Sequence, residues 1–111
     1  MHDELLAPQA AWASLQQGRA QLIDLRARDE PDVPRIPGAR AIPLDDLPSE
    51  LATLDRERPV VLVSGRGRKA AEAMQVLRAA GLTASAVEGG MRAWLDAELP
   101  VESAVESPPP E

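Results

Sequence analysis

Apolar and polar residues follow two different periods along this chain, and the two periods alternate. Residues 60–63 are apolar at every position, as in a strand buried on both faces of a sheet, whereas the apolar side chains of residues 69–80 fall on one helical stripe. The expected strands are residues 5–6, 21–26, 40–43, 59–63 and 84–87, and the expected helices are residues 9–17, 45–54, 69–80 and 91–97. Residues 5–6 form either a short edge strand or an entry segment. This alternation predicts an α/β domain with a parallel sheet, right-handed crossovers and helices on both faces.

The all-apolar strand is expected at the centre of the sheet, and it ends at Ser64. The residues after Ser64 are Gly65, Arg66, Gly67, Arg68, Lys69 and Ala70, where the next helical pattern begins. A strand that leads through a glycine-containing loop into a helix gathers backbone N–H groups and a helix N-terminus around one point. The sequence therefore predicts an anion-binding loop over residues 64–70, with three cationic side chains beside it.

Residues 36–39 have the chemistry of a type II turn. Pro37 fixes φ at the second position of the turn, and Gly38 permits the positive φ that the third position requires. Asp45 or Asp46 is the expected N-cap of the helix that follows. The segment between the two longest apolar strands is therefore expected to hold a turn and a helix.

Two charged residues, Asp24 and Arg26, come at the carboxyl end of the expected strand 21–26. Open α/β sheets place their functional groups at this end of their strands. Two interpretations stay open. The two residues form an ion pair or a loop cap, or they border the functional site and support it.

The composition is that of a single acidic domain. The chain has 111 residues, which is enough for one core, and its net charge of −6 argues against general affinity for nucleic acids or acidic membranes. Within this acidic sequence there is a cluster of basic residues, Arg66, Arg68 and Lys69. No apolar run approaches the ~20 residues of a membrane-spanning helix, and the acidic start lacks the pattern of a signal peptide. The cytoplasm is therefore the expected location.

The sequence contains no cysteine, and its one histidine is His2. Disulfides, thiolate metal sites and thiol nucleophiles are therefore excluded for this sequence. A conventional zinc site is not expected, because such sites are built from cysteine and histidine ligands. We expect neither a metal ion nor another cofactor.

Four segments together resemble those of a single-domain rhodanese-like sulfurtransferase. The segments are Asp24-Leu25-Arg26, the turn Arg35-Ile36-Pro37-Gly38-Ala39, the loop Ser64–Ala70, and Glu88-Gly89-Gly90-Met91-Arg92-Ala93-Trp94 followed by Leu99-Pro100-Val101. Each segment alone is a weak signal, but their order and spacing agree with the family over about residues 5–101. The resemblance implies a three-layer α/β fold, with a five-stranded, mainly parallel sheet and helices on both faces. It also implies that Asp24, Arg26 and Arg35 border the site.

Ser64 stands where this family has its catalytic cysteine. The resemblance implies a thiolate that takes sulfur from thiosulfate or another donor, holds it as a persulfide, and passes it to cyanide or a thiol acceptor. A serine hydroxyl cannot hold that sulfur, and without a base it is a weak nucleophile. Three further departures are Lys69 for an arginine, Ala70 for a serine and Arg35 for a histidine. Ala70 also argues against a phosphatase loop, which needs an arginine at the sixth position after its cysteine.

Two origins of Ser64 stay open: a native loss of the cysteine, or a variant in which serine replaces it. Three functions follow. The chain is a binding module for an oxyanion (thiosulfate, sulfate or phosphate) or for an acidic surface of a partner. Alternatively, it is a thiosulfate sulfurtransferase whose parent carries cysteine at position 64 and delivers sulfur to a thiol or protein acceptor. Finally, it is a folded domain whose loop cations are merely solvated. We expect a monomer or weak dimer, with an acidic, disordered tail over residues 102–111.

Overall fold

Five parallel strands form the centre of the fold, in the order β1-β5-β4-β2-β3. A computed structural model of the protein describes residues 5–26, 35–65 and 68–102. The strands are β1 (Leu5–Leu6), β2 (Gln21–Asp24), β3 (Arg40–Ala41), β4 (Val60–Val63) and β5 (Ala84–Val87). The helices are α1 (Pro8–Gln16), α2 (Leu47–Glu50), α3 (Arg68–Ala79) and α4 (Gly90–Asp96), with 3₁₀ turns η1 (Leu44–Asp46) and η2 (Leu51–Thr53) on either side of α2. The α/β class and the five-stranded parallel sheet expected from the sequence are confirmed.

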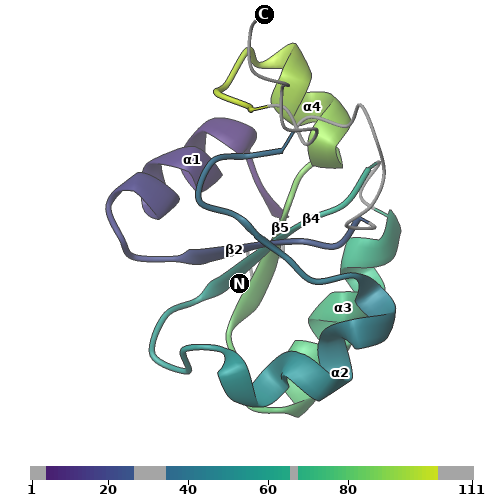
Figure 1. Cartoon of the computed structure of the whole chain (residues 1–111). Helices are drawn as coiled ribbons and strands as arrows, with labels where there is room; N and C mark the ends of the chain where they lie inside the picture. Colours follow the sequence, from purple (N-terminus) through teal and green to yellow (C-terminus); the bar gives the residue numbers. More distant parts are fainter. Residues whose placement is uncertain (1–4, 27–34, 66–67, 103–111) are drawn as a thin grey trace, which may run out of the picture.

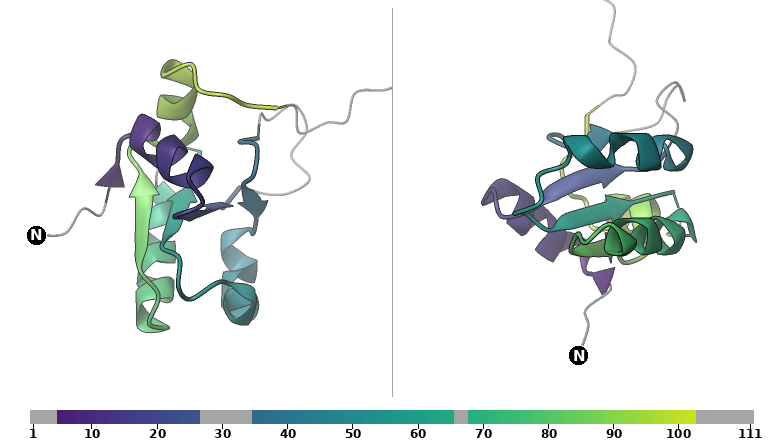
Figure 2. Two further views of the ribbon diagram at one scale, coloured as in Figure 1. Left: turned by 90° about the vertical axis from the view of Figure 1, so that its left-hand side faces the viewer. Right: turned by 90° about the horizontal axis from the view of Figure 1, so that it is seen from below.

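Strand β4 lies at the centre of the sheet, as its apolar sequence predicts. It pairs in parallel with β2 on one side and with β5 on the other, and all four of its residues are buried. Helices α1 and α4 cover one face of the sheet, and α2 and α3 cover the other (Figure 1). The edge strand β1 lies beside β5 (Figure 2, left). Both faces of β4 are therefore shielded from water.

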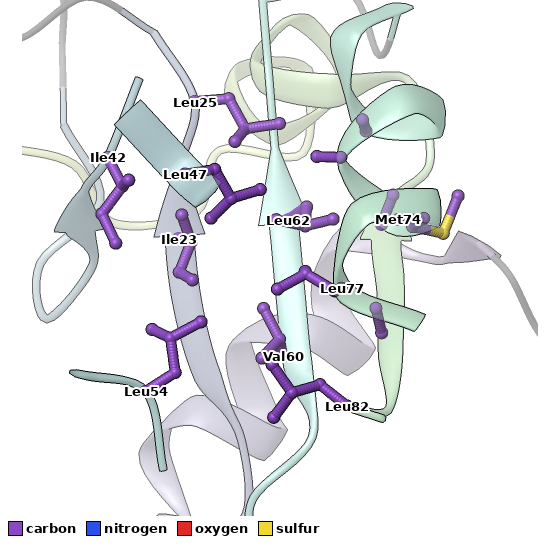
Figure 3. Close-up of a cluster of buried hydrophobic side chains, with 14 residues drawn as sticks. Ile23, Leu25, Ile42, Leu47, Leu54, Val60, Leu62, Met74, Leu77 and Leu82 are labelled. Carbon is purple, nitrogen blue, oxygen red and sulfur yellow. The ribbon is translucent and has the colours of Figure 1, made fainter. Parts of the chain in front are cut away.

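Alternate residues of β4 belong to two separate cores. Val60 and Leu62 face α2 and α3, where they pack with residues such as Leu77 (Figure 3). Val61 and Val63 face the other way, into the cluster that contains Trp94. This division follows from the two-residue period of a strand.

Trp94 anchors the core beneath α1 and α4. Its side chain is fully buried, and its Nε1–H donates a hydrogen bond of 3.0 Å to the carbonyl of Pro100. Its ring meets that of Trp12 edge-on, with the centroids 5.9 Å apart, and Trp12 packs against this core. Aromatic pairs favour this geometry because the positive edge of one ring meets the negative face of the other.

The segment between β3 and β4 differs in part from expectation. Gly38 has a φ of 85°, and the Ala39 N–H donates to the carbonyl of Ile36, which confirms the predicted turn. The expected single helix over residues 45–54 is divided into the short α2 and two 3₁₀ turns. Asp46 occupies the N-cap position of α2, but neither its side chain nor that of Asp45 caps the helix or η1, so the capping prediction is wrong.

The C-terminal segment returns to the site-bordering loop. An isolated antiparallel bridge joins Arg35 to Glu102, with both N–H to carbonyl distances at 2.7 Å. The expected tail begins with Glu102, whereas this residue is held to the domain through its backbone. Residues 103–111 of the expected tail lie outside the described residues. Across the described ranges, no helix combines the length and apolar character needed to cross a membrane.

We predict that Leu62→Ala lowers the free energy of unfolding by about 2–5 kcal/mol, because Leu62 is completely buried in the central strand and its truncation leaves a cavity. Equilibrium urea denaturation followed by circular dichroism measures this change. Leu95→Ala is the matched control, since Leu95 is 42% exposed and its truncation changes stability by about 0.5 kcal/mol or less. Equal losses in the two variants would contradict the central role of β4.

Candidate functional site

The carboxyl ends of β2 and β4 bring the expected site residues to one edge of the sheet. Asp24 lies beside Val63 in the parallel register, and the Leu25 N–H donates a hydrogen bond of 2.8 Å to the Val63 carbonyl. Ser64 follows Val63 directly, and α3 begins four residues later at Arg68. The topology therefore places Ser64, Asp24 and the N-terminus of α3 at the same edge.

Ser64 is buried and its side chain lacks a hydrogen-bond partner. The residue is 2% exposed, and within the described part of the chain its Oγ neither donates to nor accepts from another group. An unmade hydrogen bond of a buried hydroxyl costs about 1–3 kcal/mol, so buried polar groups nearly always have a partner. The hydroxyl of Ser64 is therefore unexplained by the packing of the fold alone.

The backbone on either side of this hydroxyl is fixed by α4. The Met91 N–H donates to the Ser64 carbonyl at 2.7 Å, and the Arg92 N–H donates to the Gly65 carbonyl at 3.3 Å. These are N–H groups of the first turn of α4, which have no partner within their own helix. Because these two N–H groups of α4 already donate to loop carbonyls, they are not available to an anion. An anion at the loop would instead interact with the N-terminus of α3.

The start of α4 requires a glycine at its N-cap, Gly89. Gly89 has a φ of 78°, and a Cβ atom at this residue would lie 2.6 Å from the Cβ of Ala93. No other amino acid fits that backbone and that space without displacing α4. The Gly89-Gly90 pair thus supports the loop indirectly, by letting α4 begin where it reaches Ser64.

The other loop residues divide into several groups. Lys69 is exposed in the first turn of α3, whereas the side chain of Ala70 is buried in the core beneath α2 and α3. Arg66 and Gly67 lie outside the described residues, and for Arg68 only its place as the first residue of α3 is described. The binding role that the sequence assigns to Gly65, Arg66, Gly67, Arg68, Lys69 and Ala70 stays a prediction.

Asp24 is the centre of a buried ion-pair network. Its carboxylate accepts hydrogen bonds from the Arg26 backbone N–H at 3.0 Å, from the Arg26 guanidinium at 2.7 and 3.0 Å, and from the Arg35 guanidinium at 3.0 Å. Burial raises the pKa of Asp24, but the hydrogen bonds and charge of Arg26, with the hydrogen bond from Arg35, outweigh it and hold the pKa below its ordinary value. Asp24 and Arg26 therefore form an ion pair, as the first of the two interpretations from the sequence proposed.

Sequence reasoning placed Arg35 near the site but missed its two contacts. Its side chain binds Asp24, and its backbone pairs with Glu102, so it joins β2 to the C-terminal segment. Neither partner is close in sequence. The sequence pointed to the Asp24–Arg35 ion pair only through their opposite charges. Many other pairs of residues in the chain have opposite charges, so this alone could not identify the contact.

A pocket of about 340 Å³ lies beside the loop, and the sequence did not indicate it. Its lining residues are Leu25, Pro43, Leu44, Asp45 and Lys69. The pocket is formed by the end of β2, the segment leading into η1 and the first turn of α3. Among residues 5–26, 35–65 and 68–102, no group of three carboxylate, histidine or cysteine side chains is suited to a metal ion.

Comparisons with known proteins agree with the fold. The sequence matches the family described as Rhodanese-like domain over residues 7–97. It is 34% identical over 99 residues to the thiosulfate:glutathione sulfurtransferase of Homo sapiens, covering 76% of this chain and 86% of the human protein.

Two further matches differ in how much of the other protein this chain covers. It is 35% identical over 88 residues to the HTH-type transcriptional regulator Rv0324 of Mycobacterium tuberculosis, covering 77% of this chain and only 38% of the regulator. The crystal structure of a rhodanese-like domain protein from Staphylococcus aureus superposes with a TM-score of 0.76 at 30% identity, covering 90% of this chain and 99% of that one. This chain thus spans nearly all of the crystallised Staphylococcus aureus chain but less than half the length of the regulator.

We predict that Asp24→Asn lowers the free energy of unfolding by about 1–3 kcal/mol near neutral pH, because hydrogen bonds to a charged group are lost. The pKa of Asp24 in the fold is below its ordinary value of 3.8, so the carboxylate stabilises the fold above that value. Its contribution is lost as the pH falls through the lowered pKa, and the two proteins should converge there. Urea denaturation over a pH series measures this.

Asp96→Asn is the control for the pH series. Asp96 is largely exposed, and its oxygen is 4.0 Å from the Arg92 guanidinium, so its contribution to stability is small at every pH. A difference between Asp24→Asn and the unmodified protein that stays constant down to low pH would contradict the ionic role of Asp24.

Proposed function

Because this chain belongs to the rhodanese-like domain family, we propose that it is a member without sulfur-transfer activity that binds a small oxyanion at the loop of residues 64–70. Thiosulfate, sulfate and phosphate are the candidate ligands. The observation that supports this is the buried hydroxyl of Ser64, which stands at the end of the central strand without a partner among the described residues.

The absence of a thiol argues against sulfur transfer. Holding a transferable sulfur atom requires a thiolate that forms a persulfide, and this sequence has no cysteine. Serine could act as a nucleophile only with a base to remove its proton. The one histidine of the sequence, His2, lies outside the described residues, and Ser64 Oγ contacts no carboxylate among those described.

Three features favour an oxyanion as the ligand. The hydroxyl of Ser64 can donate a hydrogen bond to it, which removes the cost of a buried unpaired group. The N-terminus of α3 favours negative charge through its free N–H groups and its dipole. The exposed ammonium of Lys69 lies in the first turn of the same helix. All three would act on a ligand held between β4 and α3.

The second candidate function is a thiosulfate sulfurtransferase in which serine has replaced the catalytic cysteine. The 34% identity to a thiosulfate:glutathione sulfurtransferase favours it. The name of that relative describes a sulfur-transfer activity, and this chain covers 86% of its length. The two candidates share the fold and the loop. They differ in whether a thiol at position 64 alone supplies the activity.

We predict that sulfate and thiosulfate raise the melting temperature in a saturable way, because a ligand of the folded state stabilises it by mass action. At ten times the Kd the gain is about 1.4 kcal/mol, or on the order of 5–10 °C for a domain of this size. Differential scanning fluorimetry against chloride at equal ionic strength measures it. A melting temperature that responds equally to chloride and to sulfate would contradict the loop as an oxyanion site.

Ser64→Ala separates specific binding from general salt effects. It should reduce the sulfate-dependent gain, and without sulfate it should not destabilise the protein, because it removes an unpaired hydroxyl. Ser49→Ala is the matched control, since Ser49 is exposed in α2 and its hydroxyl bonds to the Asp46 carbonyl. That variant should keep the full response to sulfate.

We predict that the unmodified chain shows no thiosulfate:cyanide sulfurtransferase activity, because it has no sulfur-accepting thiol. Thiocyanate formation against an enzyme-free blank measures this. Ser64→Cys and Ser49→Cys provide a thiol at the loop and a matched exposed thiol elsewhere. Turnover by the unmodified chain would overturn the first candidate function.

The cysteine variants decide between the two candidates. Activity in Ser64→Cys but not in Ser49→Cys means that only the thiol is missing, which supports the second candidate. Inactivity in both means that Lys69, Ala70 or Arg35 has also removed the activity, which supports the first. Mass spectrometry for a persulfide on Ser64→Cys locates the defect before or after the sulfur is accepted.

A further inference from the structure

The pocket beside the loop carries two opposite charges that have no ion-pair partner among the described residues. Lys69 contributes the positive charge from α3, and Asp45 contributes the negative charge from η1. Both residues are exposed, and neither forms an ion pair or a side-chain hydrogen bond within the described part of the chain. Asp45 caps no helix. Its carboxylate therefore has no structural role in the contacts described.

In another pocket, of about 270 Å³, the charged side chains already have partners. It lies at the amino end of β2, and its arginines are already paired. Arg40 binds Glu50 at 2.8 Å, and Arg58 binds Asp55 at 3.0 Å. A charged ligand there would have to displace an existing partner, whereas a ligand between Lys69 and Asp45 would not.

We propose that the pocket between Lys69 and Asp45 binds a small aliphatic zwitterion, with a carboxylate at one end and an ammonium group at the other. The carboxylate pairs with Lys69, where the N-terminus of α3 adds to the attraction. The ammonium group pairs with Asp45. The two charges come from separate elements, η1 and α3, and do not pair with each other, so we assign a ligand that carries its charges at opposite ends and can reach both.

The lining between the two charges suits a methylene stem. Leu25 is fully buried at the end of β2, and Pro43 and Leu44 are half-buried beside it. A volume of about 340 Å³ is at the lower end of the ~300–1,000 Å³ range of small-molecule sites. The apolar lining favours binding of a short aliphatic chain. The charges of Lys69 and Asp45 give selectivity against molecules that carry only one charge.

This site is distinct from the oxyanion loop, because Ser64 does not line the pocket. Lys69 is shared by both, whereas Asp45 belongs to the pocket alone. A variant at Asp45 therefore tests the zwitterion site without removing a feature of the oxyanion site. Asp46 provides a matched control, since it is an exposed neighbour with the same charge that does not line the pocket.

Binding of 4-aminobutyrate to the full chain tests the proposal, with butyrate and butylamine as probes that each lack one of its two charged groups. Chemical-shift titration of the ¹⁵N-labelled protein gives both affinity and location. We expect the amide signals of Leu25, Leu44, Asp45 and Lys69 to shift. We expect 4-aminobutyrate to bind about two- to five-fold more tightly than either probe, which is the contribution of one exposed ion pair.

Asp45→Asn should remove the preference for 4-aminobutyrate over butyrate, and Asp46→Asn should retain it. Equal binding of 4-aminobutyrate and butyrate by the unmodified chain, or equal effects of the two variants, would overturn the proposal. The sulfate response of Asp45→Asn is measured in parallel and should persist. Failure of the zwitterion site thus leaves sulfate binding intact, and failure of the oxyanion loop leaves 4-aminobutyrate binding intact.

Discussion

Burial of β4 on both faces is the constraint on which the rest of this structure depends. Its four residues divide between two cores, one under α1 and α4 and one under α2 and α3, so β4 cannot shift without disturbing both. A one-residue change of register would exchange the two sets of side chains. Ser64 directly follows this strand. The packing of β4 therefore fixes the position of Ser64, and contacts within the loop are not needed to do so.

The contacts around Ser64 extend this rigidity to the polar groups. The first turn of α4 holds the Ser64 and Gly65 carbonyls, and two arginines hold the carboxylate of Asp24. Arg35 also binds Glu102 through its backbone, which ties the C-terminal segment to the same edge. The described part of the site is thus assembled from segments distant in sequence that hydrogen bonds hold together before any ligand is present. Among the described residues, the buried hydroxyl of Ser64 makes no such bond.

The parts of this structure that sequence could predict are those governed by local periodicity and by residues with restricted backbones. The apolar run of β4, the stripe of α3 and the Pro37-Gly38 turn each specify a conformation within a few residues. The interrupted helix around Asp46 was not predictable in the same way. Propensity and capping signals are weak there, and tertiary packing of Leu47 beneath the short α2 decides the conformation.

The arrangement of the site was predictable in topology but not in its contacts. Parallel strands bring their carboxyl ends to one edge, so Asp24 and Ser64 were expected at the same edge, and the pairing of β2 with β4 makes them neighbours. Which arginines bind Asp24, and that Asp45 and Lys69 face one pocket, depends on side chains from segments with no sequence relationship. The spacing of sequence motifs therefore predicts where the backbone of a site lies. Which charged side chains pair with one another can be seen only in the folded structure.

A loop that stabilises an anionic sulfur species does so with N–H groups, a helix dipole and fixed cations, and none of these depends on the atom that carries out the chemistry. Replacing a thiol by a hydroxyl removes the nucleophile but leaves a hydrogen-bond donor at the same point. Because β4 and α4 fix the backbone on either side, that change requires no rearrangement of the fold. Loss of sulfur chemistry and retention of anion binding are therefore physically compatible outcomes of this one residue, and in the proposed function the buried hydroxyl of Ser64 favours the second, because an anion would supply its missing hydrogen-bond partner.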